Sequence, residues 1–319
     1  MIQTLYRCLV CAVIALWSAI SSAAPAAAAS NTLDLPGVTV HVDFRGSEFT
    51  AGTQPVLAWI ERSATIVHGY YGRFPVKNLQ IRVISVDGRG VQGGTTFGAP
   101  QALIRVRVGR EVTEAQLSDD WVLVHEMIHL ALPDVGRDHA WLSEGLATYV
   151  EGIARAQAGN RAIADVWSEY MRSMPQGLPQ AGDQGLDHTH TWGRTYWGGA
   201  IYCLLADVEI RRRSDNRIGL QQALQAIAEK SGGLTADWPI SRVLATGDAA
   251  LGMSVLQDLY DQMKDTPMQP DLPALWKRLG IELDGGRLRL HDDAPLAAIR
   301  KAITVPASSR SEEAATNRR

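Results

Sequence analysis

The chain has 319 residues, of which 46% are hydrophobic, and its formal net charge at pH 7 is −3. This composition is ordinary for a globular protein with a buried core, and the length allows one large domain or two modest ones. The small net charge argues against nucleic acid as a partner and against electrostatic attachment to a membrane.

The N-terminal segment, residues 1–29, has the features of a signal peptide. Arg7 provides a weak positive charge, residues 9–20 form a short apolar stretch, and small residues with cleavage motifs ending at Ala24 and Ala29 follow. The apolar stretch is short for a transmembrane helix, so an uncleaved anchor is only the alternative. We expect a periplasmic or secreted protein without stable membrane insertion once the signal has been removed.

The cysteines agree with a fold that does not depend on disulfides. Cys8 and Cys11 lie within the signal segment, so the mature chain keeps Cys203 alone. A single cysteine cannot form an intramolecular disulfide. Cys203 lies among apolar residues, including Ile201 and Leu204, and this context favours a buried small side chain over a nucleophile.

A small sheet lobe is predicted over residues 30–120. Alternating apolar and polar residues predict strands at 38–44, 79–86 and 103–108, with an amphipathic helix at 55–71. This order of elements places a sheet with one covering helix ahead of the rest of the chain.

A glycine-rich stretch interrupts this sheet at residues 88–98. Val91–Gly98 is our candidate for an edge strand, which a family resemblance carried by residues 125–211 implies; its unpaired N–H and C=O groups could bind an extended peptide. An ordinary hairpin loop is the alternative interpretation of the same residues.

A mostly helical lobe is predicted over residues 121–305. A loop rich in Gly, Pro and Asp interrupts it at 175–190, and a turn with a short closing element is expected at 284–300. Residues 306–319 are polar and are predicted to be a disordered tail. The helices are predicted at 121–132, 140–157, 162–174, 196–213, 220–230 and 253–263.

The sequence His125-Glu126-Met127-Ile128-His129 has the form H-E-x-x-H within an apolar helix. Histidines at positions i and i+4 lie on one helix face, so both imidazoles can reach one metal ion. Glu126 then lies beside the metal, where it can take a proton from a bound water. The alternative is a buried helix with two hydrogen-bonded core histidines and a surface glutamate.

Glu144 is the candidate for a third ligand. Catalytic zinc sites use three protein ligands and leave one position open for water. Fourteen residues separate Glu144 from His129, which is enough for a turn and a returning helix. A metzincin would require histidine at position 135, where this chain has Val135. His139 is within reach in the sequence, but its spacing fits no known zinc motif.

Three segments resemble the gluzincin clan of metallopeptidases. HEMIH at 125–129 followed by WLSEGLATYVE at 141–151 is similar to the clan signature, an HExxH motif plus a glutamate in a W-L-x-E-G-x-A helix. Residues 195–211, TYWGGAIYCLLADVEIR, are similar to a helix of the glycyl aminopeptidase-like (M61-type) branch and its peptidase MA-like relatives. Gly198 replaces a lysine that is common there, so this third match is looser.

The resemblance implies a zincin-like α+β fold, with a small mixed sheet lobe followed by a mostly helical lobe. It also implies Zn²⁺ as the cofactor, and Tyr196 as a hydrogen-bond donor to the oxyanion. Together with the residues, it predicts zinc-dependent hydrolysis of peptide bonds in short peptides, with Glu126 as general base. The alternatives are a non-catalytic periplasmic binding module with a zincin fold and a zinc hydrolase that acts on a non-peptide amide.

The sequence leaves the choice between aminopeptidase and endopeptidase open, and it gives no oligomeric state. Many gluzincin aminopeptidases hold the substrate amine with a glutamate in a G-x-M-E-N strand, but residues 93–98 contain no carboxylate. Asp183, Asp187 and Glu151 are the remaining candidates for an amine anchor.

A pair of histidines lies near the tyrosine in the sequence. His188 and His190 are in the polar loop that precedes Tyr196, where they could shape a substrate pocket or contact the oxyanion. A solvated loop without a role is the alternative.

Overall fold

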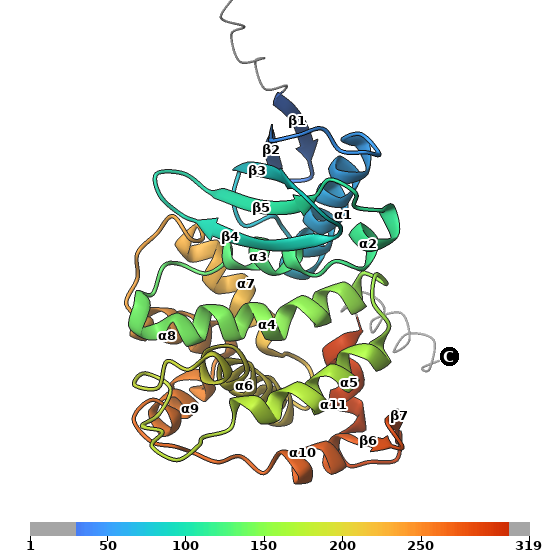
Figure 1. Ribbon diagram of the computed structural model, residues 1–319. Helices are drawn as coiled ribbons and strands as arrows, with labels where there is room; N and C mark the ends of the chain where they lie inside the picture. Colours follow the sequence, from blue (N-terminus) through green and yellow to red (C-terminus); the bar gives the residue numbers. More distant parts are fainter. Residues whose placement is uncertain (1–29, 306–319) are drawn as a thin grey trace, which may run out of the picture.

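The protein is described here by a computed structural model, which covers residues 30–305. The predicted signal peptide, 1–29, and the predicted tail, 306–319, lie outside these residues. A sheet forms one end of the molecule, and helices are stacked beneath it in successive layers (Figure 1). The mixed sheet lobe and the helical lobe expected from the sequence are therefore both present.

The sheet has five strands in the order β1-β2-β3-β5-β4. The strands β2 (Val38–Arg45), β3 (Asn78–Val86) and β5 (Leu103–Gly109) run parallel to one another. Two antiparallel strands flank them, β1 (Ser30–Leu35) beside β2 and β4 (Val91–Phe97) beside β5. The strand β4 is thus an edge strand, as predicted for Val91–Gly98, and the hairpin-loop interpretation is wrong.

Alternation along the central strands gives the sheet one apolar face. Helix α1 (Gln54–Tyr71) packs under this face, and it begins with Pro55 in its first turn and ends at Gly72, whose φ is 73°. Glycine adopts such a left-handed conformation without the steric cost that a Cβ brings. The fully buried strand residues are Val40, Val42, Leu79, Ile81, Val83, Ile104, Val106 and Val108.

The helix α3 (Val122–His129) lies between the sheet and α4 (Ala140–Gln157) (Figure 1). All of its residues are buried, because one side faces the strands and the other faces α4. The short helix α2 (Glu114–Asp119) precedes it and starts with a capping box at Thr113. The observed helix α3 is therefore shorter at both ends than the helix predicted at 121–132.

The tyrosine segment is not a plain α-helix. A π-helical turn, Arg194–Gly198, leads into α6 (Gly199–Arg213), which packs along α4. A Cβ on Gly145 would lie 2.2 Å from the Cα of Gly199, so the two helices touch backbone to backbone. This close crossing brings the segment that carries Tyr196 against the helix that carries Glu144.

The remaining elements complete the helical lobe, and several of them were not predicted. The missed elements are β1, α2, α8, α10 and the strands β6 and β7. The turn and the short closing element expected at 284–300 correspond to the turn between β6 and β7 and to α11. The bounds of these elements, with those of the predicted helices, are α5 (Ile163–Ser173), α7 (Leu220–Ser231), α8 (Ile240–Leu251), α9 (Val255–Met263), α10 (Leu272–Leu279), β6 (Ile281–Asp284), β7 (Arg287–Leu290) and α11 (Ala297–Thr304).

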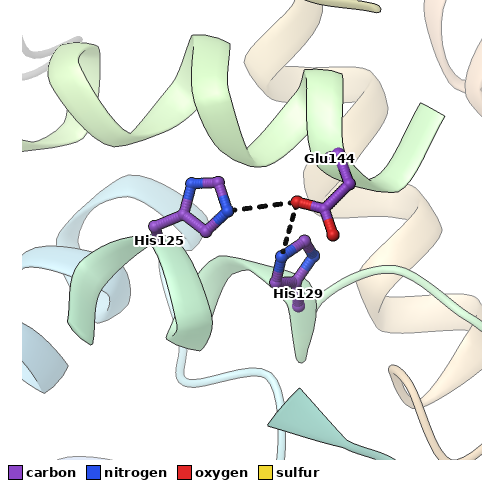
Figure 2. A group of neighbouring side chains, drawn as sticks. All are labelled: His125, His129 and Glu144. Carbon is purple, nitrogen blue, oxygen red and sulfur yellow. Dashed lines mark hydrogen bonds and ion pairs between the residues drawn. The ribbon is translucent and has the colours of Figure 1, made fainter. Parts of the chain in front are cut away.

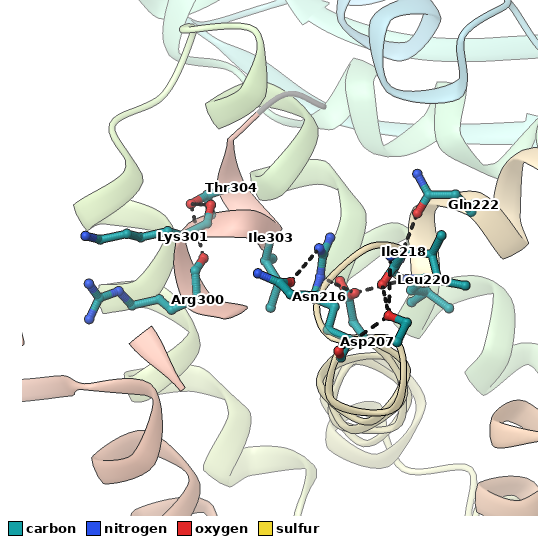
Figure 3. Close-up of polar contacts among 12 residues, drawn as sticks. Asp207, Asn216, Ile218, Leu220, Gln222, Arg300, Lys301, Ile303 and Thr304 are labelled. Carbon is teal, nitrogen blue, oxygen red and sulfur yellow. Dashed lines mark hydrogen bonds and ion pairs between the residues drawn. The ribbon is translucent and has the colours of Figure 1, made fainter. Parts of the chain in front are cut away.

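A buried carboxylate joins three of these helices. Asp207 on α6 accepts a hydrogen bond of 2.8 Å from Arg211 Nε and one of 3.0 Å from the main-chain N–H of Leu220, where α7 begins (Figure 3). The hydroxyl of Tyr149 on α4 donates to its other oxygen at 3.0 Å. Asp207 and Arg211 are both almost fully buried, so each supplies the counter-charge that the other needs.

The apolar core is continuous from the sheet to the helical lobe. Its largest fully buried side chains in the helical lobe include Trp141, Trp167, Tyr149 and Tyr202. Cys203 is buried among them as a free thiol, as the sequence predicts, and burial raises the pKa of this thiol far above its usual value. Within the described residues, no helix is both long and apolar enough to cross a bilayer.

Candidate metal centre

Two neighbouring helices bring His125, His129 and Glu144 together. The histidines project from α3 and the glutamate projects from α4, and one carboxylate oxygen faces both rings (Figure 2). Glu144 Oε2 lies 3.3 Å from His125 Nε2 and 3.5 Å from His129 Nε2. Among residues 30–305, these are the three side chains of metal-binding type whose ligand atoms lie within 4.8 Å of one another.

This donor set fits a zinc ion. In a tetrahedral site with ligand bonds of about 2.0–2.2 Å, the ligand atoms lie about 3.3–3.6 Å apart. The two separations between Glu144 and the histidines fall in that range. Two imidazoles and one carboxylate also form a donor set that catalytic zinc sites use.

The pKa shifts of His125 and Glu144 favour metal binding as well. Burial lowers the pKa of His125, which keeps its ring neutral to lower pH than usual. Burial raises the pKa of Glu144, but hydrogen bonds from His125 and His129 lower it more, so the carboxyl pKa lies well below its usual range. Neutral imidazoles and an ionised carboxylate are the forms that bind metal.

Contacts around the ligands hold them in place. His129 Nδ1 lies 2.9 Å from Ser143 Oγ, a hydrogen bond that leaves Nε2 directed at Glu144. The ring of Trp121 packs edge-on against His125, with 5.5 Å between the ring centroids. Sequence reasoning did not place Ser143 or Trp121 at the metal site, although both lie next to residues of the recognised motifs.

Glu126 lies under the edge strand β4 and not among the ligands. Thr96 Oγ1 is 2.6 Å from Glu126 Oε2 and 2.9 Å from the main-chain carbonyl oxygen of the same glutamate. A Cβ on Gly94 would lie 2.6 Å from Glu126 Cγ, so glycine is required for this approach. Gly94 and Thr96 therefore fit around Glu126, which the sequence pattern did not reveal.

Tyr196 completes the rim of the site. Its ring stacks on Trp192, with 5.6 Å between centroids, and lies parallel to the ring of His125 at 6.5 Å. Burial raises the pKa of Tyr196, and the negative charges of Glu144 and Glu126 raise it further. The phenol therefore remains protonated, and able to donate a hydrogen bond, above its usual pKa of about 10.

A cleft of about 630 Å³ opens over these residues. The strand β4 forms one wall, and because it pairs only with β5, its other side has free backbone groups that face the cleft. The walls also include His125, Glu126, Glu144 and Tyr196. All five residues predicted for the site thus contribute to one cleft, since His129 lines it too.

Other residues considered from the sequence lie elsewhere. His139 Nδ1 is 3.1 Å from Asp187 Oδ1, which places this histidine outside the metal centre. His188 pairs with Asp265 at 2.9 Å and is half exposed, and neither it nor His190 lines the cleft.

Two of the three candidate amine anchors are also excluded from the cleft. Asp183 forms a buried ion pair with Arg194, with 2.7 Å between Oδ2 and Nε. Asp187 accepts hydrogen bonds from Trp141 and from the hydroxyl of Tyr260. Glu151 lines a second cavity that adjoins the metal centre.

The chain has the fold of the M1 zinc aminopeptidases, which agrees with the gluzincin-type fold expected from the sequence. An aminopeptidase N family protein from Idiomarina loihiensis matches with a TM-score of 0.57 at 14% identity, over 79% of this chain and 49% of that chain. A variant of an M1 zinc metallopeptidase from Deinococcus radiodurans matches with a TM-score of 0.52 at 17% identity, over 76% of this chain and 52% of that chain.

A further structure, of an M1 zinc metallopeptidase variant from Deinococcus radiodurans bound to a Tyr-Ser-Ala substrate, gives a TM-score of 0.51 at 16% identity over 76% of this chain and 52% of that chain. This chain spans about half the length of these solved structures. No family model and no curated protein matches the sequence. The closer assignment to the M61-type branch remains a prediction.

Proposed function

We propose that this protein is a zinc-dependent peptidase in which His125, His129 and Glu144 hold the metal. The observation that carries the proposal is the convergence of these three ligand atoms beside Glu126 in a cleft walled by an edge strand. A bound zinc ion would supply a Lewis acid that activates water at neutral pH and offsets the charge of an oxyanion. Two solved structures of similar fold are of M1 zinc metallopeptidases, which supports the proposal.

Glu126 is the general base in this proposal. Glu126 follows the metal ligand His125 directly in the sequence, and Thr96 donates a hydrogen bond that holds one of its carboxylate oxygens. From this position it accepts a proton from the attacking water and transfers that proton to the amine that leaves. The hydrogen bond to Thr96 restricts the carboxylate to one orientation, which helps to place the base before substrate binds.

Tyr196 and the edge strand β4 are the groups that contact the substrate in this proposal. The raised pKa of the tyrosine keeps its hydroxyl protonated, so it donates a hydrogen bond to the carbonyl oxygen as negative charge develops there. The free edge of β4 binds the peptide backbone in an extended conformation by adding a strand to the sheet. This mode of binding recognises the peptide backbone and does not require a free terminus. We therefore propose that the protein acts on short, unstructured peptides.

Two measurements test the proposal together. Elemental analysis of protein prepared without added metal should find about one zinc per chain, as expected for a single site. The Glu126→Gln variant should keep this zinc and lose at least about 100-fold in turnover of a peptide library, since glutamine cannot accept the proton. Unchanged turnover in this variant would contradict the role of Glu126.

The alternatives predict different results in the same experiments. Full zinc occupancy without cleavage of any peptide would favour a non-peptide amide as substrate or a binding module. Cleavage of a Gly/Ala peptide but not of its N-acetylated form would identify an aminopeptidase, whereas equal rates would identify an endopeptidase.

We also propose export to the periplasm or the medium, on the signal-like pattern of residues 1–29. Mass spectrometry of the exported protein should then find a new N-terminus between Ala24 and Asn31. An intact Met1 in the membrane fraction would contradict cleavage.

A further inference from the structure

A second cavity, of about 520 Å³, adjoins the cleft over the metal centre. Trp121, His125 and Tyr196 line both spaces, so the two are separated only by the rim of the site. A substrate held with its scissile bond beside His125 would therefore place a neighbouring side chain at the mouth of this cavity.

The mouth of the cavity is aromatic. The side chains of Trp121 and Trp192 are among the few large hydrophobic groups that remain exposed in the described part of the chain, at 52% and 60%. Both line the cavity, and Trp192 stacks on Tyr196. The faces of such rings attract cations as well as apolar groups.

The base of the cavity contains two arginines and two glutamates, but the arginines are not equally available. Arg155 is almost fully buried, and each of its three guanidinium nitrogens donates to the protein. Nη1 donates to Glu151 at 2.9 Å, Nε to Asn160 Oδ1 at 2.6 Å, and Nη2 to the main-chain carbonyl of Asp119 at 3.0 Å. Because it is almost fully buried and each nitrogen already binds the protein, Arg155 is a structural residue that is poorly accessible to a ligand.

Arg161 is shared between the two glutamates. Its Nη1 lies 2.8 Å from Glu169 Oε2 and 3.7 Å from Glu151 Oε2. Burial lowers the pKa of Arg161, but these carboxylates outweigh burial and raise it, which indicates a negative local potential. The side chain of Glu169 is 40% exposed and that of Arg161 20%, and the carboxylate of Asp119 at the rim is 98% exposed. The accessible charge around the cavity is therefore mainly negative.

We propose that this cavity binds the side chain of a lysine or arginine in the substrate, next to the bond that is cleaved. The aromatic mouth contacts the aliphatic part of such a side chain, and the carboxylate of Glu169 receives its charged end. A glutamate or aspartate at the same place would meet the exposed carboxylates of Glu169 and Asp119, while both arginines are already paired with glutamates. This inference rests on the proposed peptidase function, because it names the substrate class of that same site.

The first test is a set of peptides that differ at one position beside the scissile bond, with lysine, leucine or glutamate there. We expect kcat/KM for the lysine peptide to exceed that for the glutamate peptide by about fivefold to tenfold, as for a partly exposed ion pair with cation–π support. The Glu169→Gln variant should reduce this ratio, and the leucine peptide should be affected little. Asp165→Asn is the matched control, because Asp165 lies on the same helix but is exposed and outside the cavity.

The second test does not depend on turnover. Zinc-loaded Glu126→Gln protein is titrated with the same lysine and glutamate peptides by calorimetry, alone and combined with Glu169→Gln. Tighter binding of the lysine peptide that weakens in the double variant would support the subsite. Equal affinity for the two peptides, a preference for glutamate, or no binding of either would overturn it. Absence of cleavage in the wild type, with the lysine preference retained in binding, would instead contradict only the proposed reaction.

Discussion

At the scale of single residues, the metal centre depends on Glu144. The carboxylate is the one acidic group that faces both histidine rings, and its oxygen lies 3.3 Å and 3.5 Å from their Nε2 atoms. His139, the other ligand that the sequence allows, is held by Asp187. The choice between the two residues can be tested directly.

Glu144→Ala should reduce zinc content sharply, because two imidazoles alone do not make a complete site. His139→Ala is the control and should keep about one zinc per chain, the single-site value. Elemental analysis of both variants after dialysis provides the measurement. Retention of full zinc by Glu144→Ala with loss in His139→Ala would show that the ligand was assigned wrongly.

Tyr196→Phe should keep zinc and lower kcat more than it raises KM, because the hydroxyl acts on the charge that develops in the transition state. The loss of one such donor costs about 3 kcal/mol, or roughly 100-fold. Since burial and nearby carboxylates raise the pKa of Tyr196, the wild-type enzyme should not lose this donor below about pH 10. Steady-state kinetics of the wild type and of Tyr196→Phe across pH provide the measurement. Wild-type kinetics in the variant would contradict the proposed role of Tyr196.

At the scale of elements, the site depends on two approaches that only glycine permits. Gly145 and Gly199 allow α4 and α6 to touch, and Gly94 allows β4 to lie on Glu126. Without these contacts the tyrosine segment and the edge strand would both lie further from the metal ligands. The glycine-rich character of residues 88–98 is thus partly explained by the packing of the site.

Gly94→Ala should impair catalysis without removing the metal. The new Cβ would lie 2.6 Å from Glu126 Cγ, so either the strand or the carboxylate must move. A misplacement of about 1 Å can cost on the order of 100-fold in rate. Gly52→Ala is unsuitable as a control because its φ is 73°, whereas Gly69→Ala, which meets no atom within 4 Å, is suitable. Equal kcat/KM in the Gly94 and Gly69 variants would argue against the packing of β4 on the base.

At the scale of the whole molecule, the helical lobe behind the site is joined by buried polar contacts as well as by the core. Asp207 contacts Tyr149 on α4, Arg211 on α6 and the first residue of α7. Because α4 also carries Glu144, this network supports the metal centre from the side opposite the sheet. We expect its loss to affect stability first and zinc binding second.

Asp207→Ala should destabilise the protein by about 3–5 kcal/mol, because it leaves the charge of Arg211 buried without a partner. Glu209→Ala is the matched control on the same helix. Its ion pairs with Arg212 and Arg213 are largely exposed, and such pairs contribute at most about 1 kcal/mol. Urea denaturation gives both free energies of unfolding, and similar losses in the two variants would contradict the importance of the buried pair.

The sequence by itself predicted the proposed ligand set and the proposed base. The spacing of His125, Glu126 and His129 follows from helix geometry, which is local, and Glu144 follows from a helix that returns after a short turn. The edge strand at Val91–Gly98 was predicted from the resemblance to zincins and from its place between two predicted strands, while its glycine content equally allowed a loop. The missed helices α8 and α10 do carry apolar residues at helical spacing, such as Leu272, Leu275 and Leu279 in α10, so the sequence contained a signal that the prediction did not use.

Only the tertiary structure decided how these parts meet. The contact of Thr96 with Glu126, the crossing at Gly145 and Gly199, and the second cavity around Glu151 all join segments that are distant in the sequence. Of the three candidate amine anchors, only the tertiary structure showed that Glu151 lines a cavity beside the metal centre and that Asp183 and Asp187 do not. Such contacts depend on which faces of helices and strands are buried together, and that is a property of the whole packed core, not of any local spacing.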